Sequence, residues 1–319
     1  MRGPAAVALS LILSSGCARY ADFTLPPLPS GDPTLTYALD PRPEPVLPRG
    51  EAHDVLNPSV IGPDMFYSEF DGRTWHTAHA RSEDGLHWTK IGFVLSPDPK
   101  TWEGSYIAAN GSALFHVKQV WYWYQAGPRD RPRVGLARSW HKEPQPVLEP
   151  GPYMSWDEMG VADPCVIRID AYFYLYYLGQ DRAHRQRLGA ARSTDGIHWQ
   201  RLRTNPILEL GDAGAFDERG LGEPAVWIAN GFYWMLYTGR DMAENRRLGL
   251  ARSLNGVRWQ KLPAVFSGTA AWDSKVICDP TISGGGVYFG GGDIARPDEN
   301  LNGQIGFATL RPVNATLGK

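Results

Sequence analysis

Cysteine is scarce in this sequence, and so is net charge. The 319 residues contain three cysteines, and 32 Lys and Arg residues nearly balance 34 Asp and Glu residues, which leaves a formal net charge of −2. A chain without excess positive charge has no electrostatic surface for nucleic acid or for an anionic membrane, so we expect neither as a partner. Cys165 and Cys278 lie in apolar stretches. We expect two buried free thiols there, and a single disulfide is the alternative.

Motifs for metals and common cofactors are also missing. No group of His and Cys residues has the spacing of metal ligands, and no glycine-rich phosphate loop follows an expected strand. The Ser, His and Asp residues do not assemble into a hydrolytic triad. We therefore expect no cofactor and no metal ion.

No apolar run is long enough to cross a membrane. Residues 5–13 are apolar and small residues precede Cys17, a pattern typical of an export signal and shorter than the roughly 20 residues of a membrane span. The segment ends in what resembles a bacterial lipoprotein cleavage site, where Cys17 is lipidated, although Ser14 replaces the usual Leu, Val or Ile. We expect a signal peptide at residues 1–17, export to the periplasm or cell surface, and an anchor at Cys17. Residues 18–44 are rich in proline, which predicts an extended tether.

Aromatic residues and turn formers are abundant, and they recur periodically. The chain has 12 Trp, 14 Tyr, 11 Phe, 35 Gly and 26 Pro, which favours short strands and tight turns. A unit of roughly 55 residues repeats. In most copies it opens with an aromatic–acidic pair, such as Trp156-Asp157, followed seven or eight residues later by a key polar position. The five key positions are Asn57, Asn110, Asp163, Glu223 and Asp279.

Each key position leads into a series of four short strands. A short apolar run comes first, then an aromatic-rich strand, a Gly-x-Ala-Arg-Ser segment or its variant, and a fourth strand, which the last unit lacks. We predict an all-β fold, a five-bladed β-propeller with four-stranded antiparallel blades. Pro45, Val46 and Leu47 resemble the missing strand, so we expect an N-terminal strand to close the last blade. The propeller, a single catalytic domain, would occupy residues 45–313, with a tail at residues 314–319.

The first strand of each propeller blade lines the central channel, so the five key side chains would converge there. Three of them are carboxylates, and like charges at close range raise at least one pKa. One protonated and one ionised carboxyl group are what glycoside hydrolysis requires. We expect the acidic residues beside the repeated aromatics, Asp157, Asp217 and Asp273, to be structural. The repeated arginines would form ion pairs that pack the blades; they are Arg81, Arg138, Arg192 and Arg252.

The blade pattern, with Asp163-Pro164 and Glu223-Pro224, resembles the five-bladed glycoside hydrolases of families 43, 32, 68 and 130. The resemblance to families 43 and 32 implies that Glu223 is the general acid and that Asp163 tunes it. Asn57 stands where those families carry the Asp that acts as base or nucleophile, so either Asp279 or Asp54 would replace it. Family 130 has Asn-Pro and Asp-Pro at the corresponding places, which would make Asp163 the acid.

The resemblance therefore implies a glycosidase that hydrolyses an oligo- or polysaccharide, with furanosides or xylosides favoured. The alternatives are a mannoside phosphorylase or hydrolase like family 130, for which the sequence offers few basic residues to hold phosphate, and a non-catalytic glycan-binding propeller. We expect a monomer. The candidate substrate-binding residues are Asn57, Asn110, Trp102, His76, Arg240 and Arg296.

Overall fold

The chain folds almost entirely into β-strands, which confirms the expected all-β class. The computed structural model describes residues 19–314, and its strands are accompanied there by the short 3₁₀ helix η2 (Ala271–Asp273). Within these residues no helix has the length and apolar character needed to cross a membrane.

Strands pair antiparallel in sets of four, as the repeat predicts. Set one comprises β3 (Asp54–Ile61), β4 (Asp64–Phe70), β5 (Trp75–Arg81) and β6 (Thr89–Leu95). Set two comprises β7 (Ile107–His116), β8 (Gln119–Ala126), β9 (Arg133–Arg138) and β10 (His141–Lys142). Set three comprises β11 (Gly160–Ile169), β12 (Tyr172–Gln180), β13 (Gln186–Ser193) and β14 (Gln200–Leu202). Set four comprises β15 (Gly220–Ala229), β16 (Phe232–Arg240), β17 (Arg246–Ser253) and β18 (Gln260–Phe266). Set five comprises β19 (Val276–Ser283), β20 (Gly286–Gly292), β21 (Gln304–Asn314) and β2 (Leu35–Pro41).

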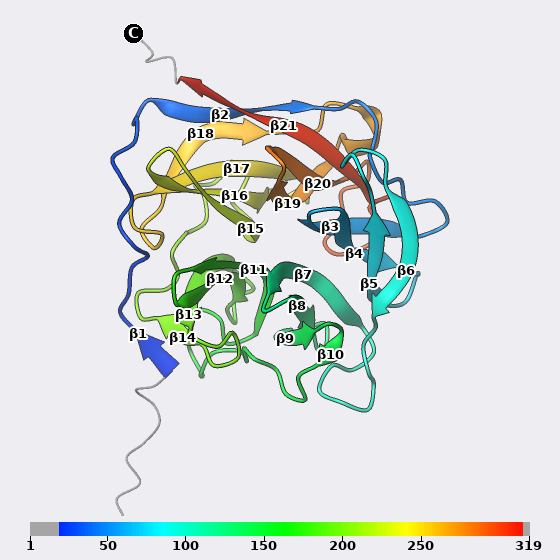
Figure 1. Cartoon of the computed structure of the whole chain (residues 1–319), viewed down its shortest axis with the longest axis horizontal. Coiled ribbons are helices and arrows are strands. Elements are labelled where there is room, and N and C mark those ends of the chain that lie inside the picture. The colour runs from blue at the N-terminus through cyan, green and yellow to red at the C-terminus, as the bar shows by residue number, and fades with distance from the viewer. Residues whose placement is uncertain (1–18, 315–319) are drawn as a thin grey trace, which may run out of the picture.

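The first strands of the sets lie around the middle of the molecule. β3 contacts β7, β7 contacts β11, β11 contacts β15, β15 contacts β19, and β19 contacts β3. Figure 1 shows these strands facing the centre, with the fourth strands at the outside. Parallel bridges between neighbouring sets join the strands into a 13-stranded and an 8-stranded sheet.

The hydrophobic core lies between neighbouring sets, where the aromatic second strands are buried. Trp123 of β8 packs with Phe173 and Tyr177 of β12, and Trp234 of β16 packs with Phe289 of β20. Aromatic rings suit the half-buried, pleated faces of strands, which explains their abundance. Most of the aromatic residues therefore hold the sets together.

The N-terminal segment differs from the expected tether. Leu35, Tyr37 and Leu39 alternate along β2, which pairs along its length with β21, while Leu47 adds a single bridge to Ile305. β1 (Tyr20–Ala21) pairs in parallel with β14. The last set does contain an N-terminal strand, but it is β2 and not the expected residues 45–47, so the predicted position was wrong. Proline is tolerated on edge strands, so the proline content concealed the alternating pattern.

The cysteines of the described residues are free thiols. Cys278 is fully buried and Cys165 partly so, and neither forms a disulfide. The expected signal peptide, the anchor at Cys17 and the tail after Asn314 lie outside the described residues.

Candidate active site

The five key positions share one unusual backbone conformation. Their φ angles are 48° at Asn57, 49° at Asn110, 48° at Asp163, 48° at Glu223 and 52° at Asp279. A β-bulge interrupts the strand register at each of them. Left-handed backbone is uncommon for residues other than glycine and costs on the order of 1 kcal/mol or more per residue. Because bulges redirect side chains, this repeated distortion turns all five toward the centre.

Two cavities meet at these five side chains. The first, here called the funnel cavity, has a volume of about 160 Å³ and is also lined by Trp75, Gln125 and Arg246. The second, here called the axial cavity, has a volume of about 210 Å³ and is lined by residues further along the inner strands, such as Ser59 and Ser112. The five key residues line both cavities. They therefore form a polar belt across the centre of the molecule.

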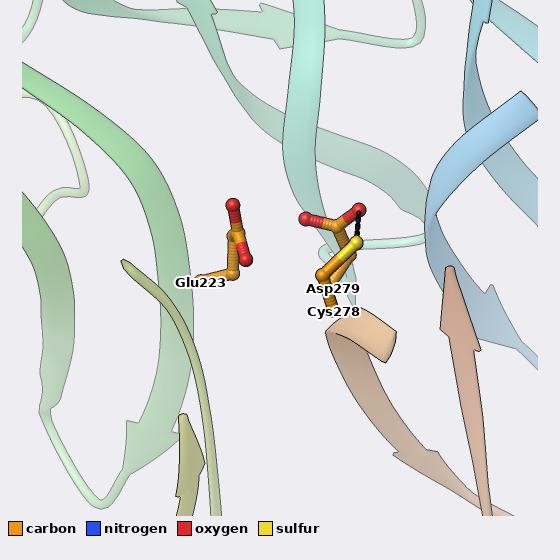
Figure 2. A group of neighbouring side chains, drawn as sticks. All are labelled: Glu223, Cys278 and Asp279. Atoms are coloured by element: carbon orange, nitrogen blue, oxygen red, sulfur yellow. Dashed lines mark hydrogen bonds between the residues drawn. The ribbon is translucent and has the colours of Figure 1, made fainter. Parts of the chain in front are cut away.

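Asp279 is the most firmly held member of this belt. Its Oδ1 accepts a hydrogen bond of 2.8 Å from Nδ2 of Asn57, and its Oδ2 accepts bonds from the Asn57 backbone N–H at 3.3 Å and from the Cys278 thiol at 3.0 Å. Figure 2 shows the thiol bonded to the carboxylate. These donors favour the ionised carboxylate and fix its orientation.

Glu223 faces Asp279 with less restraint. Glu223 lies on β15. Figure 2 shows its carboxyl group opposite that of Asp279, and an oxygen of each lies within 4.8 Å of the other. The Oε2 atom of Glu223 is buried, and it has no hydrogen-bond partner among the described residues. An unpartnered buried oxygen is unfavourable by itself, and a bound hydroxyl or ether oxygen would relieve it.

Asp163 completes the acidic cluster. It lies on β11, and its Oδ1 is 3.5 Å from the donor Nδ2 of Asn110. Burial, and secondly the charge of Glu223, raise the pKa of Asp163 to about 7. The same two causes raise the pKa of Asp279 well above its ordinary value. The cluster therefore retains protons near neutral pH, as closely spaced carboxyl groups do.

Arg246 partly balances this negative charge. It begins β17, and its guanidinium is buried beside the cluster. Burial opposes its charge, but Cys278, Glu223 and Asp279 outweigh that and raise its pKa. Our sequence analysis missed Arg246. The corresponding residues of sets two and three are Pro132 and Gln186, which also line the funnel cavity. Variation at one position among otherwise similar repeats was the available signal.

The structure brings together only some of the predicted substrate-binding residues. Asn57, Asn110 and Arg240 line the funnel cavity. Within residues 19–314, Trp102 packs instead against the core between sets one and two. The His76 ring stacks on Phe93 and contacts Asp71 and Ser96. Arg296 contributes its backbone carbonyl, which accepts a bond from Arg246.

Asp54 is excluded as the replacement base by its surroundings. Its carboxylate is fully buried and accepts backbone N–H bonds from Asn300 at 2.5 Å, Leu301 at 2.8 Å and Gly303 at 2.8 Å. Three donors fix its orientation, and Asp54 lines neither the funnel cavity nor the axial cavity, where a base would have to act. Asp54 therefore anchors the loop between β20 and β21.

The acidic residues beside the repeated aromatics make buried structural contacts, as expected, and Asp273 accepts the Ala270 backbone N–H at 2.7 Å. Asp157 is buried between the Tyr177 hydroxyl and Arg201, and Asp217 between the Tyr237 hydroxyl and Lys261. Each joins a second strand to a fourth strand.

The repeated arginines do not behave uniformly. Arg138 pairs with Glu143, as an ion pair would require. Arg192 and Arg252 instead lie over the aromatic rings of Tyr172 and Phe232. The prediction of a common ion pair was therefore wrong for these two, because the aromatic strands offer rings where a carboxylate was expected.

Glu223, Cys278 and Asp279 are close enough together to hold a metal ion. A thiol must lose its proton to bind a metal. Burial and the two neighbouring carboxyl groups raise the pKa of the Cys278 thiol well above its ordinary value, and the thiol donates to Asp279. This donor set fits a protonated network better than a metal site.

An all-β chain that gathers carboxyl groups in a central cavity has the arrangement of a glycoside hydrolase. The sequence model of the "Glycosyl hydrolases family 32 N-terminal domain" matches residues 65–278, more than half of the chain. The protein belongs to this family. The matched region contains Asp163 and Glu223 and begins beyond Asn57.

Individual relatives include a phosphorylase and a probable hydrolase; the latter, a probable sucrose-6-phosphate hydrolase of Vibrio cholerae, is 28% identical over 142 residues, which are 42% of this chain and 25% of that protein. A 1,2-β-oligomannan phosphorylase of Thermoanaerobacter sp. (strain X514) is 30% identical over 131 residues, which are 38% of this chain and 43% of that protein. The chain thus spans about half the length, or less, of the curated relatives it matches.

Solved structures share the fold at low sequence identity. One, described as a GH130 glycoside hydrolase that targets β-1,2 mannosidic linkages in Candida mannan, has a TM-score of 0.64 and 16% identity, covering 90% of this chain and 96% of that one. A thermostable family-43 glycoside hydrolase has a TM-score of 0.59 and 12% identity, covering 80% and 88%.

Proposed function

We propose that the five sets are the blades of a closed five-bladed propeller and that its centre hydrolyses a glycosidic bond. The cyclic contacts of the first strands support closure, as does the backbone bond from Val55 N–H to the Gly303 carbonyl, 2.9 Å, between sets one and five. The observation that carries the function is the cluster of Asp163, Glu223 and Asp279 at the funnel cavity. The substrate would be an oligo- or polysaccharide, with furanosides and xylosides favoured.

Each carboxyl group has a distinct role in this proposal. Glu223 has a free oxygen and protonates the leaving-group oxygen. Asp279, oriented by Asn57 and Cys278, attacks the anomeric carbon or activates water when it is ionised, a form that burial and Glu223 disfavour and that the donors Asn57 and Cys278 favour. Asp163 holds a proton near neutral pH, which limits the negative charge beside Glu223.

Glu223 and Asp279 have facing oxygens within 4.8 Å of each other, so both carboxyl groups can reach one glycosidic bond. In a retaining reaction, at a separation of roughly 5–5.5 Å between carboxyl groups, Asp279 would form a covalent glycosyl intermediate that water hydrolyses; in an inverting reaction, at roughly 6.5–9.5 Å, it would activate the water directly. NMR of the first product from an anomerically pure substrate distinguishes the two outcomes.

A hydrolysis assay tests the proposal directly. Wild type and Glu223→Gln are incubated with arabinose-, fructose-, xylose- and mannose-based oligosaccharides, and released sugars are measured. We expect wild type to cleave one series and the variant to lose at least ~100-fold, since general acid catalysis contributes roughly 10²–10⁴-fold. Equal activity of the variant would refute the assignment of the acid. Binding without cleavage by wild type would favour a non-catalytic glycan-binding protein.

A second candidate is a mannoside phosphorylase or hydrolase in which Asp163 is the acid. The raised pKa of Asp163, about 7, suits a general acid, and the similarity to an oligomannan phosphorylase supports the substrate. More basic residues reach the funnel cavity than the sequence suggested: Arg129, Arg240 and Arg246 line it. Each is already bonded to protein groups, which favours hydrolysis. Formation of mannose 1-phosphate from β-1,2-mannooligosaccharides and inorganic phosphate would support phosphorolysis.

We also propose that the protein is exported as a monomer and anchored at Cys17. The apolar run before Cys17 supports this. Mass spectrometry of the mature N-terminus, together with light scattering of the protein in solution, tests both statements.

A further inference from the structure

The loop between β20 and β21 reaches three other sets of strands. It comprises residues 293–303 and is here called the roof loop. Pro297 and Asp298 of this loop line the funnel cavity, although they come from set five. It joins two antiparallel strands and is longer than the roughly 2–5 residues of common hairpin loops.

Set two holds the tip of the roof loop through charge. The Nη2 atom of Arg129, in the turn after β8, lies 2.5 Å from Oδ2 of Asp298 and 3.1 Å from Oε1 of Glu299. The Tyr106 hydroxyl donates to Oε2 of Glu299 over 3.0 Å. One arginine and one phenol from the same set therefore bind two neighbouring carboxylates.

Set four holds the other side of the loop through its backbone. The carbonyl of Pro297 accepts hydrogen bonds from Arg246 at 2.6 Å and from Arg240 at 3.3 Å. Set one holds the end of the loop, because buried Asp54 accepts the three backbone N–H bonds described above. The loop is thus fastened at sets one, two and four.

These attachments close one flank of the funnel cavity. A glycan that ran through the cavity from set two to set four on this side would occupy the space of Pro297 and Asp298. The remaining volume of about 160 Å³ is below the roughly 300–1,000 Å³ of common ligand pockets, which leaves room for a single small unit. A cleft with one flank closed accepts the end of a chain and not its middle.

We propose that the roof loop makes this protein specific for the terminal sugar of a glycan, and that Arg129 holds the roof loop in place. This inference rests on the proposed function and adds to it the position of cleavage. Asp298 and Pro297 determine specificity in this arrangement, and Arg129 positions them.

Product analysis of the full-length protein tests the inference. Linear arabinan, inulin and xylan, and oligosaccharides of each labelled at the reducing end, serve as probes. We expect wild type to release only monosaccharide from the polymer it cleaves and to shorten the labelled chains by one sugar at a time. Arg129→Gln and the double variant Asp298→Asn with Glu299→Gln should each raise the share of longer products ~2–5-fold, the size expected for loss of an exposed ion pair.

Arg182→Gln is the matched control. Arg182 occupies the corresponding position in set three and pairs with Glu158 away from the funnel cavity. Internal cleavage by wild type from the first time point overturns the inference. So does a share of longer products that is the same in Arg129→Gln, in the Asp298→Asn and Glu299→Gln double variant, and in this control. If wild type cleaves none of these polymers and no mannose-based oligosaccharide either, the proposed function fails and a binding experiment tests the inference. The same oligosaccharides are then immobilised through either end. Binding only where the non-reducing end is free supports terminal recognition, whereas equal binding in both orientations, or none, overturns it.

Discussion

The side-chain amide of Asn57 donates a hydrogen bond of 2.8 Å to Oδ1 of Asp279, and this contact joins the first inner strand to the last. The residue that departs from the family-43 and family-32 resemblance is therefore the one that orients the proposed nucleophile. An amide at this position supplies the donor that a carboxylate could not.

Replacing this amide by a second carboxylate tests the relationship. Asn57→Asp removes a hydrogen bond to a charged group, worth about 1.5–3 kcal/mol, and places a like charge beside Asp279. We expect kcat/KM at pH 7 to fall ~10–100-fold. Asn57→Ala, which removes the same donor without adding a charge, separates the two effects. A gain of activity in Asn57→Asp would show that the catalytic base is the residue at position 57 of set one and that Asp279 does not have this role.

The Cys278 thiol should set the pH range of activity. Its hydrogen bond lowers the pKa of Asp279, against the larger raising effect of burial. Cys278→Ala removes the donor, so the pKa of Asp279 rises and the acidic limb of the kcat/KM profile moves to higher pH, by up to about one unit. Cys278→Ser retains a hydrogen-bond donor and should return the acidic limb of the kcat/KM profile to its wild-type position. Cys165→Ala, at a thiol that lines the axial cavity, should leave the profile unchanged, and identical profiles for all variants would contradict the role.

Asp163 should destabilise the folded protein at alkaline pH. Its pKa is raised from 3.8 to about 7 by burial and by Glu223, so the folded state binds a proton that the unfolded state releases. The stability from this proton is complete below pH 4 and is lost as the pH rises through 7. Asp163→Asn removes the dependence, and we expect it to be about 1–4 kcal/mol more stable than wild type at pH 8.5 and nearly equal at pH 4. Urea unfolding at both pH values measures this, and a gain that is the same at both would contradict it.

Asp54 should matter for stability more than for chemistry. Asp54→Ala leaves three buried backbone N–H groups without an acceptor, and we expect a loss of about 2–4 kcal/mol in the free energy of unfolding. Thermal unfolding checks this, with Asp71→Ala on the exposed part of set one as the control. A variant that keeps its stability and loses all activity would instead identify Asp54 as the base.

The repeat made the centre of the molecule predictable. Equivalent strand positions converge when a unit of this kind recurs, so the sequence alone predicts that five residues lie together: Asn57, Asn110, Asp163, Glu223 and Asp279. Their left-handed backbone could not be predicted, because asparagine, aspartate and glutamate in a strand do not by themselves indicate a β-bulge. The prolines that follow four of them were the nearest signal.

Contacts that break the repeat were harder to predict. Arg246 occupies a repeated strand position whose residue type differs from set to set, and Asp298 lies in a loop of set five, so the repeated residues themselves did not indicate either side chain. The prediction that Trp102 binds substrate was wrong for the opposite reason. It belongs to the repeated aromatic positions, and the repeat uses those rings for packing between sets.

The five belt residues share one φ angle, so their positions are equivalent in backbone conformation. Asparagine, aspartate and glutamate all occupy the same backbone shape, so exchanging one for another alters the charge at the centre without altering the strand that presents it. Any of the five inner strands could therefore carry the reacting side chain without a change in the architecture. In this protein the position on β3 carries an amide, and the carboxylate that faces Glu223 comes from β19.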